Sequence, residues 1–79
     1  MNYLATFHTH FSAMVTCRNL TRLGLQARMA PVPRKLSSSC GTCVSYESNG
    51  PALEAMDADS DAVYSVDDGG QYVLISRNQ

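Results

Sequence analysis

The chemistry of this sequence centres on a Cys-x-x-Cys pair, Cys40-Gly41-Thr42-Cys43. A cysteine attacks or carries sulfur as the thiolate, so a working thiol needs surroundings that lower its pKa from about 8.5. Serine hydroxyls and the cations of Arg34 and Lys35 precede Cys40 and could stabilise a sulfur anion, while Gly41 lets the backbone approach it closely. Cys40 is therefore the predicted reactive thiol. The residues predicted to bind around it are Arg34, Lys35, Ser38, Ser39, Gly41, Cys43, His8 and His10.

The same pair could instead work as a dithiol, because its spacing is that of thioredoxin-type redox motifs. In those motifs the two cysteines open a helix within a β-α-β unit, whereas the residues that follow Cys40 have strand character. This context favours a single reactive thiol over a redox pair.

A zinc site is a further alternative. His8 and His10 with Cys40 and Cys43 would supply two nitrogens and two sulfurs, a ligand set that suits tetrahedral zinc. A histidine at the end of a strand is more often a hydrogen-bonding cap, so our first expectation is a site without metal. Either histidine could also donate or accept a proton at the thiol, because imidazole titrates near neutral pH.

The number of cysteines points to reduced thiols. Three is an odd number for a small domain, and a secreted disulfide scaffold would carry a denser, even set. We therefore expect a cytoplasmic protein. Cys17 falls within a predicted helix beside its apolar positions, where a cysteine behaves as a small hydrophobe, so we expect it to fill the core.

Length and composition predict one domain, from residue 1 to residue 79, with a thin core. Hydrophobic residues make up 44% of the chain and charged residues 16%, as in a folded globular protein. No apolar run approaches the ~20 residues that cross a bilayer, and the start lacks the basic and apolar segments of a signal peptide. We expect neither a membrane-bound nor an exported protein.

Opposite charges are segregated along the chain. Residues 1–46 carry cations and no acid, whereas residues 47–79 carry all seven acids and one cation, Arg77. The simplest explanation is that the charges lie on ordinary solvated faces that are not mixed. One alternative is an anion-attracting surface at Arg34 and Lys35, and another is a protein-interaction module that pairs charges and carries out no chemistry. Cations without interleaved exposed aromatics argue against a nucleic-acid partner. Self-association would enlarge a thin core, which leaves a homodimer open.

The pattern of apolar residues predicts alternating strands and helices. A strand over residues 3–7 precedes a helix that Thr9 caps and Gly24 ends. Further strands are predicted over residues 25–32, 42–46, 62–66 and 72–76, with a short helix over 52–56 and a hairpin turn over 67–70. The apolar positions of the first helix, at roughly helical spacing, are Phe11, Met14, Val15, Leu20 and Leu23.

This element order, β-α-β-β-α-β with an extra C-terminal hairpin strand, predicts a mixed α/β (α+β) fold of the ferredoxin-like split β-α-β type. Strands one and two would run parallel, and strand three would run back between them. The exit of strand one, the start of the helix and the loop before strand three would then share one sheet edge. We therefore expect His8, Thr9 and His10 beside Cys40, where the positive helix end could stabilise a thiolate.

The segment from Pro31 through Cys40 to Gly41, Pro-Val-Pro-Arg-Lys-Leu-Ser-Ser-Ser-Cys-Gly, resembles that of a family of small bacterial selenium/sulfur carrier-like proteins. A strand ending in Phe7, Ala13 early in the helix and Gly24 after it add to the likeness, which covers the chain up to residue 48. The resemblance implies that Cys40 matches the family's characteristic cysteine and that Cys43 is less general. It also implies a carrier without a resident cofactor, which exchanges sulfur or selenium with donor and acceptor proteins and is not itself an enzyme.

Overall fold

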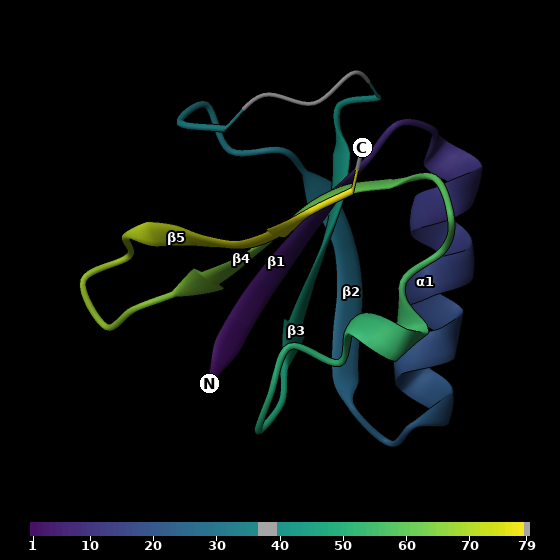
Figure 1. Cartoon of the computed structure of the whole chain (residues 1–79), viewed down its shortest axis with the longest axis horizontal. Helices are drawn as coiled ribbons and strands as arrows, with labels where there is room; N and C mark the ends of the chain where they lie inside the picture. Colours follow the sequence, from purple (N-terminus) through teal and green to yellow (C-terminus); the bar gives the residue numbers. More distant parts are fainter. Residues whose placement is uncertain (37–39, 79) are drawn as a thin grey trace.

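A computed structural model describes residues 1–36 and 40–78 of the chain, which form one α-helix, one 3-10 helix and five strands (Figure 1). Within these ranges the positions of the strands and the long helix follow the prediction to within one or two residues. In chain order the elements are β1 (Asn2–Phe7), α1 (His10–Arg22), β2 (Gln26–Pro31), β3 (Thr42–Glu47), the 3-10 helix η1 (Leu53–Ala55), β4 (Ser60–Val66) and β5 (Tyr72–Arg77).

The strands form a single sheet in the order β2-β3-β1-β4-β5, and every neighbouring pair is antiparallel. β3 lies between β1 and β2 and runs opposite to both, as predicted from the first crossover. The fold is therefore a mixed α+β structure with one covering helix. The ferredoxin-like arrangement is found only in part, because its second helix is missing from the described residues.

The short helix predicted over residues 52–56 is present only as the 3-10 helix η1 over Leu53–Ala55. Ala52 has a left-handed backbone with φ of 51°, and only a single 3-10 turn follows it. Side chains of α1 satisfy the backbone of this segment instead: Asn19 donates to the Ala55 carbonyl at 3.1 Å, and the Asp57 N–H donates to Thr16 Oγ1 at 2.9 Å. Because those groups are bonded to α1, the segment needs no helix of its own.

The ends of α1 match the prediction. Thr9 Oγ1 accepts a hydrogen bond from the Ser12 N–H at 3.0 Å, and Gly24 follows the helix with φ of 84°. The predicted apolar face is correct only in part: Leu20 is buried and Val15 is half-buried, whereas Phe11, Met14 and Leu23 are exposed. The buried face consists of Ser12, Ala13, Thr16 and Leu20. The small residues on that face let the helix approach the sheet closely, so that Leu20 is its one large buried side chain.

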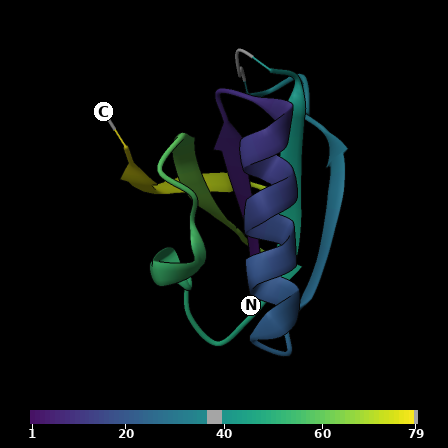
Figure 2. The same ribbon diagram turned by 90° about the vertical axis from the view of Figure 1, so that its right-hand side faces the viewer.

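Two clusters of buried residues lie on opposite faces of the sheet. α1 packs over β1, β2 and β3 and covers the larger cluster, which contains Phe7, Leu20 and the stacked rings of Tyr3 and Tyr46 (Figure 2). Cys17 packs against this cluster, as expected for a core-filling cysteine. The smaller cluster lies on the face away from α1 and is formed by Leu4, Cys43, Ala62 and Tyr64. In the described ranges, no helix has the length and apolar character needed to cross a membrane.

Candidate functional site

Cys40 lies in the turn that leads into β3 and is half-buried. The turn is closed on one side by a hydrogen bond from the Val32 N–H to the Gly41 carbonyl, at 3.1 Å. Gly41 has φ of 72°, a left-handed conformation that glycine adopts without steric cost, so glycine is the favoured residue for the turn after Cys40.

The backbone of Thr42 holds the sulfur of Cys40. The Thr42 N–H donates to Cys40 Sγ at 3.4 Å, and the thiol lies 3.4 Å from the Thr42 carbonyl oxygen, to which it can donate its own proton. When Cys40 ionises, the thiol proton is lost and the N–H donor remains. The Thr42 N–H can stabilise a charged sulfur and the Thr42 carbonyl stabilises the protonated thiol, so the backbone of Thr42 contacts Cys40 Sγ in either state.

The start of α1 lies beside this turn. His10, the first residue of α1, has Nδ1 3.3 Å from Thr42 Oγ1, so the predicted meeting of His10 with the Cys40–Cys43 segment is confirmed. This contact places the positive end of the helix dipole next to the residue that holds Cys40 Sγ. The sequence analysis had missed Thr42 itself. Its position between the two cysteines and opposite a predicted helix cap was the signal that could have identified it.

His8 points to a different part of the molecule. Its Nε2 lies 3.9 Å from the carboxylate of Asp61, next to the start of β4, and its backbone N–H donates to the Asp59 carbonyl at 3.1 Å. The two histidines therefore contact different partners although they are only two residues apart.

Cys43 lies on the face away from α1 and is 1% exposed. It packs with Leu4 and Tyr64, and its Sγ donates to the Pro31 carbonyl at 3.6 Å. Burial, with a smaller contribution from the charge of Cys40, raises the pKa of the Cys43 thiol above its usual value of 9.0. Both effects keep Cys43 protonated and unreactive.

The four residues of the alternative zinc site do not form one ligand set. Cys43 is buried in the smaller cluster and His8 is beside Asp61, whereas His10 and Cys40 both contact Thr42. Across residues 1–36 and 40–78, no three His, Cys, Asp or Glu side chains are grouped so that they could hold a metal ion. The predicted geometry of two sulfurs and two nitrogens is therefore not present.

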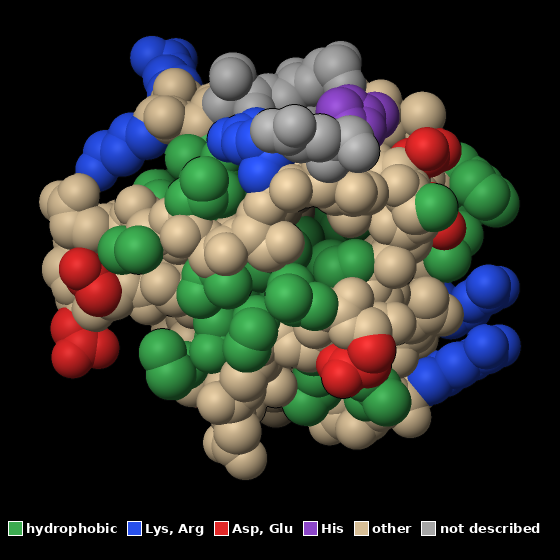
Figure 3. Space-filling model, viewed as in Figure 1, with side chains coloured by type: hydrophobic (Ala, Val, Ile, Leu, Met, Phe, Trp, Pro, Cys, Tyr) green, Lys and Arg blue, Asp and Glu red, His purple; other side chains and the backbone are tan. Residues whose placement is uncertain are grey.

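The cations predicted to attract an anion lie in the loop after β2. Arg34 and Lys35 are exposed, and the Leu36 N–H donates to the Pro33 carbonyl at 3.0 Å and closes a turn around them. Cationic side chains project from this part of the molecule (Figure 3). The predicted binding residues Ser38 and Ser39 lie outside the residues that the structure describes.

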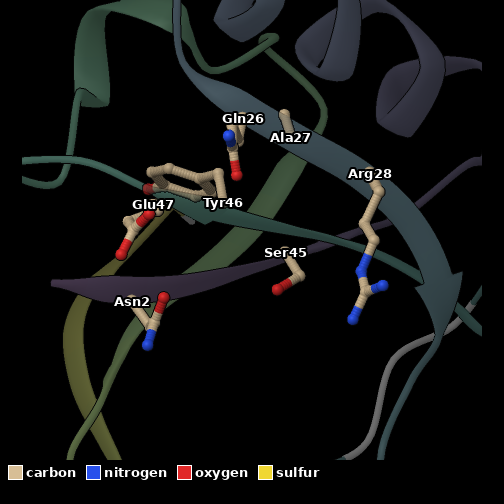
Figure 4. Close-up of a pocket in the computed structure, with 7 residues that line it drawn as sticks. All are labelled: Asn2, Gln26, Ala27, Arg28, Ser45, Tyr46 and Glu47. Carbon is tan, nitrogen blue, oxygen red and sulfur yellow. The ribbon is translucent and has the colours of Figure 1, made fainter.

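A shallow polar groove lies at the other end of the same strands. It has a volume of about 290 Å³, and Asn2, Arg28, Ser45 and Glu47 point into it from one side of the sheet (Figure 4). Ser45, the lining residue nearest to the Cys40 turn along β3, is three residues beyond Thr42, which corresponds to ~10 Å at ~3.4 Å per residue. A group bound in the groove would have to extend along β3 to reach Cys40. The alternation of polar residues along β2 and β3 was the only sign of it in the sequence.

Comparison with known proteins agrees with the resemblance noted from the sequence. A family model described as "Putative Se/S carrier protein-like" matches residues 2–58, which include α1, β1, β2, β3 and the Cys40 turn. A search of curated proteins finds no match. Because the match covers most of the chain, the protein belongs to the Se/S carrier protein-like family.

Proposed function

We propose that the protein carries sulfur or selenium on Cys40, as a persulfide or a selenosulfide, between a donor and an acceptor protein. The observation that supports this most directly is the placement of Cys40. Its sulfur is half-buried at the rim of the sheet, and the Thr42 N–H already donates to it. The family assignment supports the same kind of cargo.

The loading step is an exchange between two sulfurs. The Cys40 thiolate attacks the terminal sulfur of a donor persulfide, R–S–SH. A bond forms between Cys40 Sγ and that sulfur, and the bond between the two donor sulfurs breaks, its electron pair leaving on the donor thiolate. The proton of the terminal sulfur moves with it, so the step consumes no oxidant or reductant. A donor of the form R–S–SeH would load selenium in the same way.

The residues around Cys40 suit both directions of this exchange. During loading, the Thr42 N–H and the nearby start of α1 favour the thiolate that attacks. During unloading, Cys40 is the leaving group, and the same donor stabilises the charge that develops on it. The exposed cations of Arg34 and Lys35 would interact with the anionic terminal sulfur or selenium, or with an acidic surface on a partner.

The other two cysteines are poor candidates for this role. Cys43 is buried with a raised pKa. Cys17 and Cys40 are both half-buried and both pack against the larger cluster, but within residues 1–36 and 40–78 a backbone N–H donates to the sulfur of Cys40 and none to that of Cys17. The described residues offer no second nucleophile beside Cys40 and no enclosed cavity next to it. We infer a protein on which enzymes act, and not an enzyme. The three free cysteines fit work in a reducing compartment such as the cytoplasm.

The test is transfer of labelled sulfur. The protein is incubated with a cysteine desulfurase and cysteine labelled with radioactive sulfur, and intact mass spectrometry follows the added sulfur. We expect one labelled sulfur per chain, released by dithiothreitol, and no label on Cys40→Ser. Cys43→Ala and Cys17→Ala are the matched controls and should load like the wild type. Equal labelling of Cys40→Ser would contradict the proposal.

A second arm of the same experiment identifies which element, sulfur or selenium, the protein carries. Selenocysteine and a selenocysteine lyase replace the sulfur donor, and the mass increase distinguishes selenium from sulfur. Faster loading in one arm identifies the element that the protein carries. Absence of loading on Cys40 in both arms would rule out the carrier function.

A further inference from the structure

β5 is an edge strand with an unusual surface. It lies at the end of the sheet, so one side of its backbone has no strand partner in the described chain. Val73, Leu74 and Ile75 follow one another along it and are 54%, 49% and 43% exposed. A row of free N–H and C=O groups beside exposed apolar side chains is the surface on which another strand pairs.

The opposite edge of the sheet lacks these features. β2 presents exposed Gln26 and Arg28, and it ends at Pro31, which has no N–H to donate to a neighbouring strand. Polar or charged side chains and proline are the usual means by which an edge avoids pairing. β5 contains no proline, and its polar and charged residues, Ser76 and Arg77, lie at its end beyond the three exposed apolar residues. The two edges of one sheet therefore differ in their capacity to accept a further strand.

We propose that β5 pairs with β5 of a second copy of this chain, antiparallel about a two-fold axis, so that the two sheets join into one. The apolar residues of β5 are self-complementary in this arrangement. With Leu74 on the axis, Val73 lies opposite Ile75 of the second copy, and each exposed apolar side chain gains an apolar neighbour. The register shift between β4 and β5 beside Ile75 leaves one irregular position in each strand.

The charges at the two ends of β5 are complementary in the same arrangement. Arg77 ends the strand, and the turn before the strand carries exposed Asp67 and Asp68. Acidic side chains lie at the tip of this hairpin (Figure 3). Antiparallel pairing brings Arg77 of each copy towards the acidic turn of the other. Arg77 already lies 3.3 Å from Asp61 of its own chain, and 44% of its side chain remains exposed to receive a second acid.

Pairing through β5 would leave the two Cys40 turns independent. β3 is three strands away from β5, which corresponds to ~14 Å at ~4.8 Å per strand, and the two-fold axis places the second turn at the far side of the dimer. Each thiol stays at the rim of its own sheet. The dimer and the carrier function are thus separate hypotheses, and either can fail without the other.

The experiment measures the mass of the reduced protein in solution by sedimentation equilibrium over a range of concentrations. We expect the wild type to reach twice its chain mass of 8.6 kDa. Leu74→Lys puts two ammonium groups together on the axis and should weaken the dimer by tenfold or more. Gln26→Lys makes the matched change on β2 and should leave the dimer intact. Asp68→Lys should weaken it less, and added salt should reduce the difference between Asp68→Lys and the wild type.

A cross-link tests the register without depending on a disruptive variant. Leu74→Cys, in a chain whose three native cysteines are replaced by serine, should form a disulfide-linked dimer on oxidation, because two residues on the axis face each other. Gln26→Cys in the same background should not. A wild type that is monomeric at all concentrations would overturn the proposal. So would a dimer that Gln26→Lys disrupts and Leu74→Lys does not.

Discussion

Cys40 and Cys43 are three residues apart, yet they occupy two different kinds of site. Cys40 lies in a turn, half-buried, with the Thr42 N–H on its sulfur, whereas Cys43 lies inside β3 and is 1% exposed among Leu4, Ala62 and Tyr64. The point at which β3 begins separates them. Residues before Thr42 follow the turn, and residues after it alternate between the two faces of the sheet. The difference in burial between the two cysteines is therefore set by where the strand starts, and not by the spacing of the pair.

The largest expected difference between the two thiols is the rate of alkylation. Cys43 reacts only when β3, which has a strand on each side, opens, so we expect iodoacetamide to modify Cys40 on the order of a hundredfold faster. Peptide mass spectrometry of the reduced protein at neutral pH measures both rates.

Denaturant provides the control for this comparison. In concentrated guanidinium chloride both cysteines belong to an unfolded chain, and the two rates should agree within about threefold. Similar rates in the native protein would mean that the Cys43 site is open in solution. The difference in accessibility between Cys40 and Cys43, on which the carrier proposal depends, would then be absent.

A second difference concerns stability. Cys43→Ser places a hydroxyl among apolar neighbours and should lower the free energy of unfolding by about 2 kcal/mol. Cys40→Ser keeps a small polar group within reach of the Thr42 backbone and should change it by no more than about 0.5 kcal/mol. Urea denaturation followed by circular dichroism measures both changes. An equal loss in the two variants would show that the turn is as tightly packed as the strand.

Much of the fold could be predicted from the sequence, because its signals are local. The Thr9 cap, the glycine after α1 and the acidic turn before β5 each set the end of an element through their own backbone or side chain. The errors came from tertiary contacts. Phe11 and Met14 have helical spacing, but the buried face of α1 is set by how closely the helix approaches the sheet.

A third difference appears at alkaline pH. The pKa values of Cys43 and Tyr46 are both raised, chiefly by burial, and each group therefore ionises more readily in the unfolded chain. The stability that each group contributes is fully present below its ordinary pKa, which is 9.0 for Cys43 and 10.0 for Tyr46, and is lost as the pH rises above that value. The loss is at most about 1.4 kcal/mol per pH unit for each group.

Thermal unfolding from about pH 8 to about pH 10.5 checks this expectation. The melting temperature of the wild type should fall as the pH rises, and Cys43→Ala should remove part of the slope. Cys40→Ala should remove a smaller part of the slope, because the charge of Cys40 contributes less than burial to the raised pKa of Cys43. If the wild type and Cys43→Ala gave parallel curves, ionisation of the buried thiol would have no part in the alkaline loss.

The sequence was enough to predict where the candidate site lies in the fold, but not which residues contact one another there. The crossover from β1 through α1 was enough to place His10 near the Cys40 turn, because it fixes which ends of the elements share an edge. The crossover alone did not show that His8 and His10 contact different residues. The difference depends on the direction in which the chain leaves β1, which brings His8 to Asp61 and His10 to Thr42.

The smallest expected effect comes from His10. His10→Ala removes the side chain that contacts Thr42 Oγ1 and leaves the Thr42 N–H on Cys40 Sγ, so the alkylation rate of Cys40 should fall by no more than about threefold. Arg22→Ala, in the last turn of α1, is the control and should leave the rate unchanged. A tenfold fall in His10→Ala would make His10 a proton acceptor for the thiol. The contrast between the two thiols would then depend on the helix start as well as on β3.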